Sequence, residues 1–198
     1  MKTSYRAQLL SLLTSNQGIL TSKAVAEARI PRVYLTLLVK EGKIERAARG
    51  VYIDINSFGD EYYEFQARFP SAIFSHGTAL YIHNMTEKTP SQLEVTIPTG
   101  YNPHRFQENV LIYRISRKNH DLGVEWFNSP LGHPIKSTNL ERTFCDLLRR
   151  NKALDLALRN DSLRKLLRSG QLNEKRLLDY AQRLRCTKKL LMIQNLLP

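Results

Sequence analysis

The stretch TSKAVAEARIPRVYLTLLVKEGKIERAARGVYI, residues 21–53, predicts a helix-turn-helix followed by a β-wing. A short first helix is expected at about residues 21–28, and Pro31 suits the first turn of the second helix, where a missing N–H costs nothing. The second helix would bury Leu35 and Leu38, which lie three residues apart on one face. The first helix is expected to hide three small residues: Ala24, Val25 and Ala28.

The wing is predicted from the residues that follow this second helix. Gly42 can supply the positive φ that ends it. Residues 43–45 and 51–53 alternate in polarity like two short strands, and a basic turn at 46–50 connects them. Another helix at about residues 3–14, with Leu9, Leu12 and Leu13 on one face, would complete the three-helix core that a winged helix needs.

The outward face of the second helix predicts contact with double-stranded DNA. Arg32, at the N-terminal end, could make a bidentate contact to guanine, worth roughly 1–3 kcal/mol of discrimination, and Thr36 could touch a thymine methyl. Basic residues of the helix and wing would instead contact phosphate, which sets affinity and salt dependence. The predicted DNA-binding residues are Arg32, Val33, Thr36, Lys40, Lys43, Arg46 and Arg49. The alternative is a winged helix that contacts proteins, with ordinary solvated charges.

Charge is distributed unevenly along the 198 residues. The net charges of residues 1–53, 54–148 and 149–198 are +6, −3 and +9, within a total of +12. The basic C-terminal part predicts a second polyanion-binding surface or a surface for antitoxin activity, with a merely solvated face as the alternative. Its candidate residues are Arg159, Arg164, Lys165, Arg168, Lys175, Arg176, Arg183, Lys188 and Lys189.

The chain as a whole predicts an α+β protein of two domains. Residues 1–53 form the winged helix-turn-helix domain, residues 54–59 a linker, and residues 60–198 a mixed α/β domain with a basic helical part from about 150. In the second domain, a possible capping box joins Thr138 and Glu141 ahead of an amphipathic helix. Strands are expected at 72–74, 93–97, 110–115 and 124–127, and the last of these is expected to pair with one of the two before it. Helices are expected at 60–69, 75–84, 151–160, 162–168, 173–184 and 187–197.

Several functional classes lack support in the sequence. No stretch has the ~18 consecutive apolar residues of a membrane span, and the N-terminus is unlike a signal peptide, so a cytoplasmic protein is expected. Cys145 and Cys186 lie in helical patterns and are expected to be reduced core thiols. His76 and His83 are seven residues apart, without the cysteine or carboxylate that would complete a metal site. We therefore expect no metal, no cofactor and no catalytic residues.

Four motifs in order along the chain resemble the AbiE-type antitoxins of bacterial type IV toxin–antitoxin systems. They are ARGVYI at 48–53, AIFSHGTALYIHNM at 72–85, LEVTIP at 93–98 and STNLERTFCDLLRR at 137–150. The resemblance implies that the N-terminal winged helix binds inverted repeats in its own promoter and represses transcription. It also implies that the C-terminal domain counteracts a nucleotidyltransferase-like toxin without a stable complex, in abortive infection of phage-infected cells.

The function expected from the sequence is therefore that of an autorepressing antitoxin. Its expected partners are operator DNA, a second copy of the chain on the paired repeats, and the toxin, but no membrane. One alternative is a stand-alone winged-helix transcriptional regulator. The other is a DNA-targeted nuclease, for which Glu61, Glu64, Glu94 and Glu125 are the carboxylates that folding could bring together.

Overall fold

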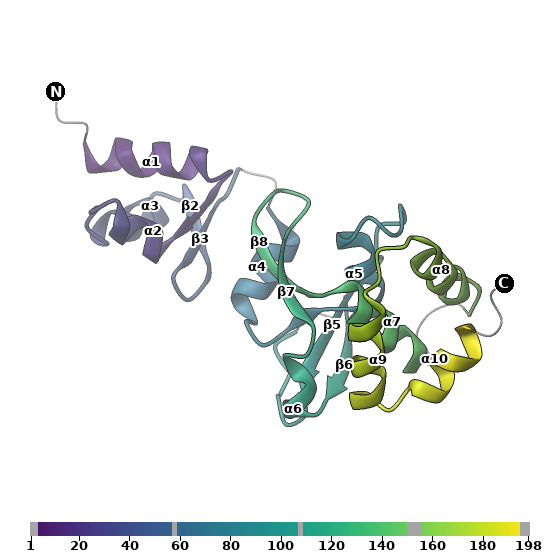
Figure 1. Ribbon diagram of the computed structural model, residues 1–198. Helices are drawn as coiled ribbons and strands as arrows, with labels where there is room; N and C mark the ends of the chain where they lie inside the picture. The colour runs from purple at the N-terminus through teal and green to yellow at the C-terminus, as the bar shows by residue number, and fades with distance from the viewer. Residues whose placement is uncertain (1–3, 57–58, 107–108, 150–155, 195–198) are drawn as a thin grey trace. The chain divides into compact units, whose positions relative to one another are not determined.

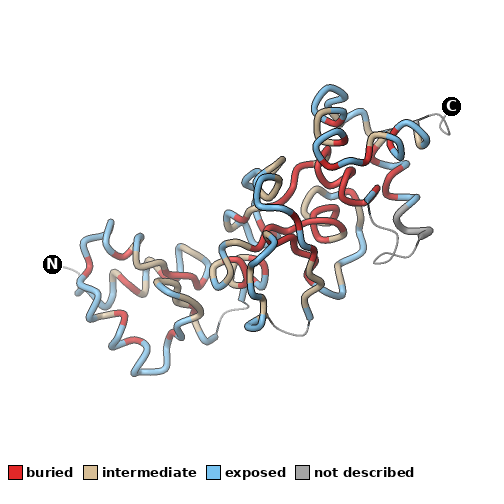
Figure 2. Tube along the Cα trace, turned by 90° about the horizontal axis from the view of Figure 1, so that it is seen from below, coloured by how far each residue is buried: buried red, intermediate tan, exposed pale blue. Residues whose placement is uncertain are grey.

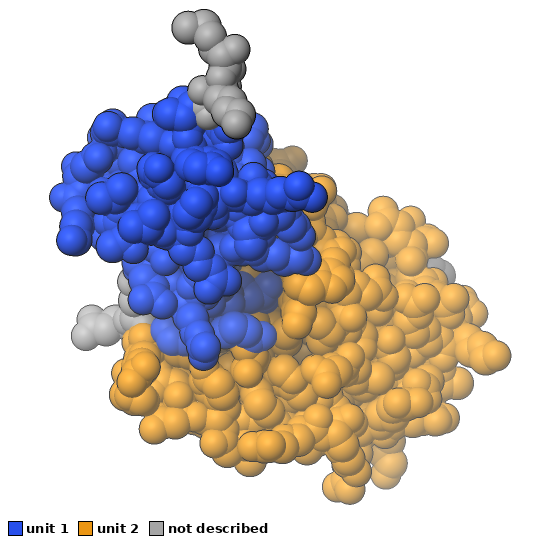
Figure 3. All heavy atoms as spheres, turned by 90° about the vertical axis from the view of Figure 1, so that its left-hand side faces the viewer, with its two compact units in different colours: residues 1–70 blue, residues 71–198 orange. Residues whose placement is uncertain are grey.

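The computed structural model describes residues 4–56, 59–106, 109–149 and 156–194, except for the side chains of 156–159 and 194. The chain forms two compact units, Met1–Pro70 and Ser71–Pro198, shown in two colours in Figure 3. Among the described residues, no helix combines the length and the apolar character needed to cross a membrane. Mixed helices and strands in two separate sheets confirm the predicted α+β class.

The N-terminal unit has the element order and strand pairing of a winged helix (Figure 1). Its elements are α1 (Tyr5–Ser15), β1 (Ile19–Thr21), α2 (Ser22–Glu27), α3 (Val33–Lys40), β2 (Ile44–Ala48), β3 (Val51–Asp54) and α4 (Glu61–Arg68). The strands form an antiparallel sheet in the order β1-β3-β2. The strand β1 was not foreseen from the sequence.

The core of this unit is aliphatic and is supplied by all three helices of the winged helix. Leu9 of α1, Val25 of α2, and Leu35 and Leu38 of α3 are buried together in one cluster. Thr21 fixes the start of α2, because its Oγ1 accepts a hydrogen bond from the backbone N–H of Ala24 at 3.0 Å. The predicted burial of Leu35 and Leu38 is confirmed, as is the positive φ of Gly42, +66°.

Two details of the winged helix differ from the sequence prediction. Ala28 is exposed and Ala24 only half-buried, because α2 ends at Glu27 and the chain turns away at Ala28. The wing turn is also shorter than predicted: β2 continues to Ala48, and only Arg49 and Gly50 separate the paired residues Ala48 and Val51. A bulge between Arg46 and Ala48 accommodates the additional residue.

The first compact unit continues beyond the winged helix to Pro70. The helix α4 lies against β2, and Asp60 caps it by accepting a hydrogen bond from the N–H of Tyr63 at 3.0 Å. The structure thus divides the chain after Pro70, whereas the sequence predicted the division at the 54–59 linker. We propose the functional boundary of the DNA-binding module at Ile53, with α4 as an addition packed on its sheet.

The C-terminal unit is built on a five-stranded mixed sheet in the order β6-β5-β4-β8-β7. Its strands are β4 (Ile73–Phe74), β5 (Leu93–Pro98), β6 (Val110–Ile115), β7 (Val124–Asn128) and β8 (Pro134–Thr138). Its helices are α5 (His76–Ile82), α6 (Arg117–His120), α7 (Leu140–Arg149), α8 (Leu156–Arg168), α9 (Glu174–Arg183) and α10 (Thr187–Gln194). The helices α8, α9 and α10 surround α7 on one side of the sheet (Figure 1).

Three sequence predictions for this unit were wrong in detail. The strand β7 pairs with β8, which the sequence did not reveal, and not with β5 or β6. The capping box is absent: Thr138 ends β8, and Asn139 caps α7 by accepting a hydrogen bond from the N–H of Arg142 at 3.0 Å. Where two helices were expected at 151–160 and 162–168, a single helix α8 runs through the described residues 156–168, while residues 151–155 lie outside the described part.

The helix α7 is the centre of this unit and is buried on nearly all sides. Residues 141–148 are all buried, including the side chains of Arg142 and Asp146. Figure 2 shows the buried segments, in red, gathered inside the C-terminal unit. Phe144, Leu147 and Leu148 supply the apolar contacts to the surrounding helices. A buried ion pair joins Arg142 Nε to Asp146 Oδ2 at 2.9 Å, so the main helix of the unit also carries its most buried charges.

His83, at the C-terminal end of α5, is predicted to make the C-terminal unit sensitive to acid. Its Nε2 lies 2.7 Å from the carbonyl oxygen of Thr138, and burial lowers the pKa of the imidazole below its usual 6.5. As the pH falls through 6.5, the unfolded state therefore gains a proton before the folded state does, and stability is lost. We expect His83→Gln to lose less stability than the wild-type chain between pH 7.5 and 5.5, measured by urea unfolding. An equal loss in both proteins would contradict this prediction.

Candidate nucleic-acid interface

The helix α3 presents one side to solvent because its other side is held in the core. Leu35 and Leu38 are only 2% and 1% exposed, which fixes the rotation of the helix about its axis. All seven residues that the sequence predicted to contact DNA are exposed: Arg32, Val33, Thr36 and Lys40 on α3, and Lys43, Arg46 and Arg49 on or near the wing. Arg32, Thr36 and Lys40 follow one another at four-residue steps and share a face of the helix.

The turn of the wing is tied to the start of α2. The backbone N–H of Ser22 donates a 2.7 Å hydrogen bond to the carbonyl oxygen of Gly50, which has a φ of +78°. A Cβ on Gly50 would lie 3.3 Å from the Ser22 hydroxyl oxygen, so a side chain there would be both crowded and strained. This contact fixes the turn that carries the exposed Arg49 with respect to the helix-turn-helix.

The charge of Lys43 is partly offset within the protein. Its Nζ lies 3.9 Å from Glu41 Oε2, and the same carboxylate oxygen accepts a 2.6 Å hydrogen bond from Arg6. A phosphate contact by Lys43 would have to compete with this half-exposed carboxylate. Lys43 is therefore a weaker candidate than Arg46 and Arg49.

The sequence prediction missed Arg29 and Leu37, which are exposed on the same part of the fold. Arg29 occupies the turn between α2 and α3 with a positive φ of +55°. Val33 and Leu37 are 58% and 44% exposed, and they lie one helical turn apart on α3. Leu37 was hidden from the sequence reasoning because a leucine in an amphipathic helix is normally assigned to the core. The exposed face of α3 therefore combines cationic and apolar side chains, as contacts to phosphates and thymine methyl groups require.

Tyr34 and Tyr52 have packing roles. Both are partly buried against the aliphatic cluster, and the ring of Tyr34 lies 5.5 Å from that of Tyr5. Neither ring is free to stack on an unpaired base.

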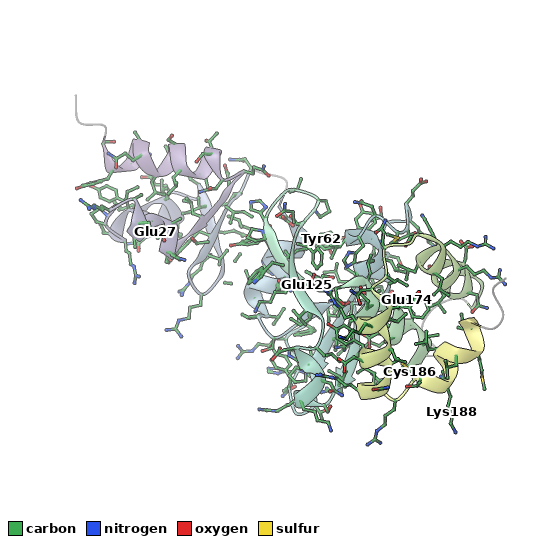
Figure 4. The ribbon with its side chains drawn as sticks, viewed as in Figure 1. Glu27, Tyr62, Glu125, Glu174, Cys186 and Lys188 are labelled. Atoms are coloured by element: carbon green, nitrogen blue, oxygen red, sulfur yellow. The ribbon has the colours of Figure 1, made fainter. Side chains whose placement is uncertain are left out.

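The basic residues of the C-terminal part divide into two groups. Arg176 Nη1 lies 3.3 Å from Glu125 and 3.7 Å from Glu141, Arg183 pairs with Asp179, and Lys189 donates to the carbonyl oxygen of Leu148. The second group is exposed and forms no ion pair with another described residue: Arg164, Lys165, Arg168, Lys175 and Lys188. Figure 4 shows Lys188 pointing away from α10. The side chain of Arg159 lies outside the described residues.

The carboxylates considered for nuclease chemistry have different surroundings within their own units. Glu94 is buried on β5 and accepts a 2.5 Å hydrogen bond from Tyr113, whereas Glu125 on β7 accepts one from Asn139. Glu61 and Glu64 belong to α4 of the other unit. Within the described part of the chain, no three His, Cys, Asp or Glu side chains are grouped closely enough to hold a metal ion.

The buried residues His76 and Cys145 have neighbours that the sequence did not reveal. His76, with a positive φ of +52°, stacks on Tyr113 with ring centroids 3.6 Å apart, and its Nδ1 lies 2.9 Å from the hydroxyl of Ser75. Cys145 and Cys186 are both buried and hydrogen-bonded to one another, which raises the pKa of Cys145 and lowers that of Cys186. Both cysteines are free and buried, as the sequence predicted for core thiols.

Comparison with known proteins extends this description of the N-terminal unit. Residues 7–53 match the model of a family described as transcriptional regulator, AbiEi antitoxin. The chain carries an AbiEi-type N-terminal domain. The match covers most of α1, all of β1, α2, α3 and β2, and most of β3, and so includes the exposed face of α3. No curated protein matches the chain. The AbiEi match supports a role as antitoxin and transcriptional regulator.

Proposed function

We propose that this protein is an autorepressing antitoxin of a type IV toxin–antitoxin system. Its winged helix binds inverted repeats in the promoter of its own operon, with α3 in the major groove and the wing against the phosphate backbone. The observation that carries the proposal is the AbiEi match over 7–53, which coincides with a winged helix whose exposed α3 face holds Arg32, Thr36 and Lys40. Inverted repeats would be occupied by two copies of the chain.

The second half of the proposal concerns the C-terminal unit. It counteracts a nucleotidyltransferase-like toxin encoded beside it, in a phage-defence system within the cytoplasm, and it does so without a stable complex. The cations Arg164, Lys165, Arg168, Lys175 and Lys188, which are exposed on α8, α9 and α10, supply a surface for this activity or for flanking DNA. Reversal of the charges of Arg164, Lys165 and Arg168 distinguishes the two roles. Loss of protection from the toxin with intact repression would assign the surface to antitoxin activity.

The DNA-binding proposal is tested by fluorescence anisotropy. The full chain is titrated into labelled duplex from upstream of its own gene and into a scrambled duplex, both at ~150 mM salt. Specific sites are typically bound ~10³-fold or more tightly than non-specific DNA. Equal affinity for the two duplexes would contradict the autorepressor function.

A growth assay tests the antitoxin role independently. The full chain is expressed with the neighbouring nucleotidyltransferase-like gene, and cell growth is compared with that of cells expressing the toxin alone. Restored growth would support the proposed antitoxin. Operator binding without any protection from the toxin would instead support the second candidate, a stand-alone transcriptional regulator, which the restriction of the family match to 7–53 favours.

Neutralising the wing is expected to weaken DNA binding without changing its sequence preference. Arg46 and Arg49 are exposed on β2 and in the turn after it, where a phosphate contact is the expected role. In the double variant Arg46→Ala/Arg49→Ala, both duplexes should bind less tightly by a similar factor. The slope of log affinity against log salt should become less steep by about two units, one for each lost phosphate contact. An unchanged slope would exclude these phosphate contacts.

A further inference from the structure

A concave basic pocket lies in the C-terminal unit, away from the cations that the sequence singled out on α8. Its volume is about 360 Å3, within the range of about 300–1,000 Å3 that is usual for small-molecule sites. Five of the residues that line it are cationic: Arg114, Lys118, Arg149, Arg183 and Arg185. No carboxylate is found among the described residues of the lining.

These cations converge from segments that are distant in the sequence. Arg114 lies on β6, Lys118 on α6 and Arg149 at the end of α7, while Arg183 and Arg185 lie at and just after the end of α9. Three of them have neighbours that hold them in place: Arg114 donates a 2.9 Å hydrogen bond to the carbonyl oxygen of Tyr101, Arg149 Nη1 lies 3.7 Å from Asp146 Oδ1, and Arg183 Nε lies 3.1 Å from Asp179 Oδ2. These carboxylates offset the charges of Arg149 and Arg183 in part. Arg114, Lys118 and Arg185 have no carboxylate partner among the described residues, so the fold still brings like charges together around one cavity, which costs free energy unless an anion occupies it.

The walls of the pocket also contain neutral groups. Thr99, Ser116 and Asn119 belong to the lining, although the Thr99 hydroxyl already donates to the carbonyl oxygen of Ile115 at 3.0 Å. Ile115 and Leu184, which are 5% and 3% exposed, supply the apolar part of the lining. Guanidinium groups bind phosphate oxygens with two parallel hydrogen bonds.

We propose that this pocket binds a small ligand with two or more phosphate groups. Arg114, Lys118 and Arg185 have no carboxylate partner among the described residues, and Arg149 and Arg183 are only partly offset. A single phosphate, with a charge of about −2, would compensate fewer of these cations than a diphosphate or triphosphate, which the pocket volume also admits. A nucleic-acid duplex is a poorer fit, because its phosphates follow an extended surface and the exposed cations Arg164, Lys165 and Arg168 of α8 do not line this cavity. The inference is independent of DNA binding by the winged helix.

Arg185 offers a substitution that removes a charge and keeps the fold. Its φ is +58°, a conformation that glycine adopts without strain, and it directly follows the C-cap of α9. The relief of strain in Arg185→Gly offsets the added entropy of the unfolded chain, so the melting temperature should be kept or raised. Lys118→Ala removes a second cation, on the exposed helix α6.

The test is isothermal titration calorimetry of the full chain with sodium tripolyphosphate, pyrophosphate and inorganic phosphate. We expect one site that binds tripolyphosphate and pyrophosphate at least tenfold more tightly than inorganic phosphate. Arg185→Gly and Lys118→Ala should each weaken tripolyphosphate binding about tenfold, as expected for the loss of one charge-assisted hydrogen bond. Lys175→Ala is the control, because it removes the same charge at the opposite end of α9 and does not line the pocket.

Two further titrations separate the sources of the phosphate groups. If ADP binds more tightly than pyrophosphate, the ligand is a nucleotide; if the two bind equally, the pocket recognises the phosphates alone. The proposal is overturned if tripolyphosphate does not bind, or if Lys175→Ala weakens binding as much as the pocket variants. It is also overturned if Lys118 and Arg185 matter only for binding of a DNA duplex, since the pocket would then belong to a nucleic-acid surface.

Discussion

Replacing Arg142 with methionine is expected to lower the free energy of unfolding of the C-terminal unit by about 3–5 kcal/mol, as is typical when one partner of a buried ion pair is removed. The Arg142 side chain is 1% exposed, and its Nε donates to Asp146 Oδ2 at 2.9 Å. Its Nη1 donates to the carbonyl oxygens of Asn119 and Leu122 at 2.9 and 2.8 Å. Methionine fills much of the space but satisfies none of these three acceptors.

Urea unfolding, followed by tryptophan fluorescence, measures the free energy of unfolding of the C-terminal unit. Trp126 is the single tryptophan of the chain and lies on β7, so its fluorescence follows the C-terminal unit. Arg183→Met is the matched control, because Arg183 also forms an ion pair at i,i+4 spacing, with Asp179 at 3.1 Å, but both side chains are about half exposed, 58% and 47%. An exposed pair of this kind typically contributes about 0–1 kcal/mol. Equal losses in the two variants would contradict the special role of the buried pair.

A double variant separates the missing charge partner from the lost packing. Arg142→Met/Asp146→Leu removes both members of the pair, so no carboxylate remains buried next to the apolar replacement. We expect it to recover part of the stability lost in Arg142→Met alone. If the double variant is less stable than the single one, Asp146 stabilises the unit through contacts other than Arg142.

The winged helix could be predicted because its signals are local. Leu35, Leu38 and Gly42 lie within eight residues, and each acts through the helix that contains it or the turn that ends that helix. The strand β1 was missed for the opposite reason. Its three residues show no alternation long enough to be recognised, and it exists as a strand only through pairing with β3, where Ile19 lies opposite Ile53.

The C-terminal unit was harder to predict because the order of its strands is set by contacts between residues that are distant in the sequence. The strands β4 and β8 pair through Phe74 and Ser137, which are 63 positions apart. The sequence placed Thr138 in a helix cap because Ser or Thr followed three residues later by Glu is a local signal. Thr138 instead pairs with Val124 in the sheet, and Asn139 caps the helix.

Charged residues were the least predictable part of the candidate sites. A charged residue within a helix is normally assigned to the surface, yet Arg142 is among the most buried residues of the chain. Likewise, Arg114, Lys118 and Arg149 drew no attention because they are scattered through the slightly acidic middle of the sequence and the start of the basic part. Only the fold brings them to one cavity.

Changing Arg32 and Thr36 of α3 to alanine is expected to abolish most of the preference for the operator. Both side chains are exposed on the helix face that Leu35 and Leu38 turn away from the core. If each makes one contact to a base edge, worth roughly 1–3 kcal/mol, the double variant should bind the operator on the order of 100-fold less tightly. Binding to the scrambled duplex should change by only a few-fold, because non-specific affinity comes from phosphate contacts.

The contrast with the wing variant makes this prediction specific. Arg46→Ala/Arg49→Ala should weaken both duplexes and flatten the salt dependence, whereas Arg32→Ala/Thr36→Ala should weaken the operator and change the slope little. A uniform loss on both duplexes in the α3 variant would mean that Arg32 contacts phosphate, and base recognition would then fall to Val33 and Leu37. Because neither side chain of the α3 variant is buried, its melting temperature should stay near that of the wild-type protein. In the growth assay it should still protect cells from the toxin, since that activity is proposed for the C-terminal unit.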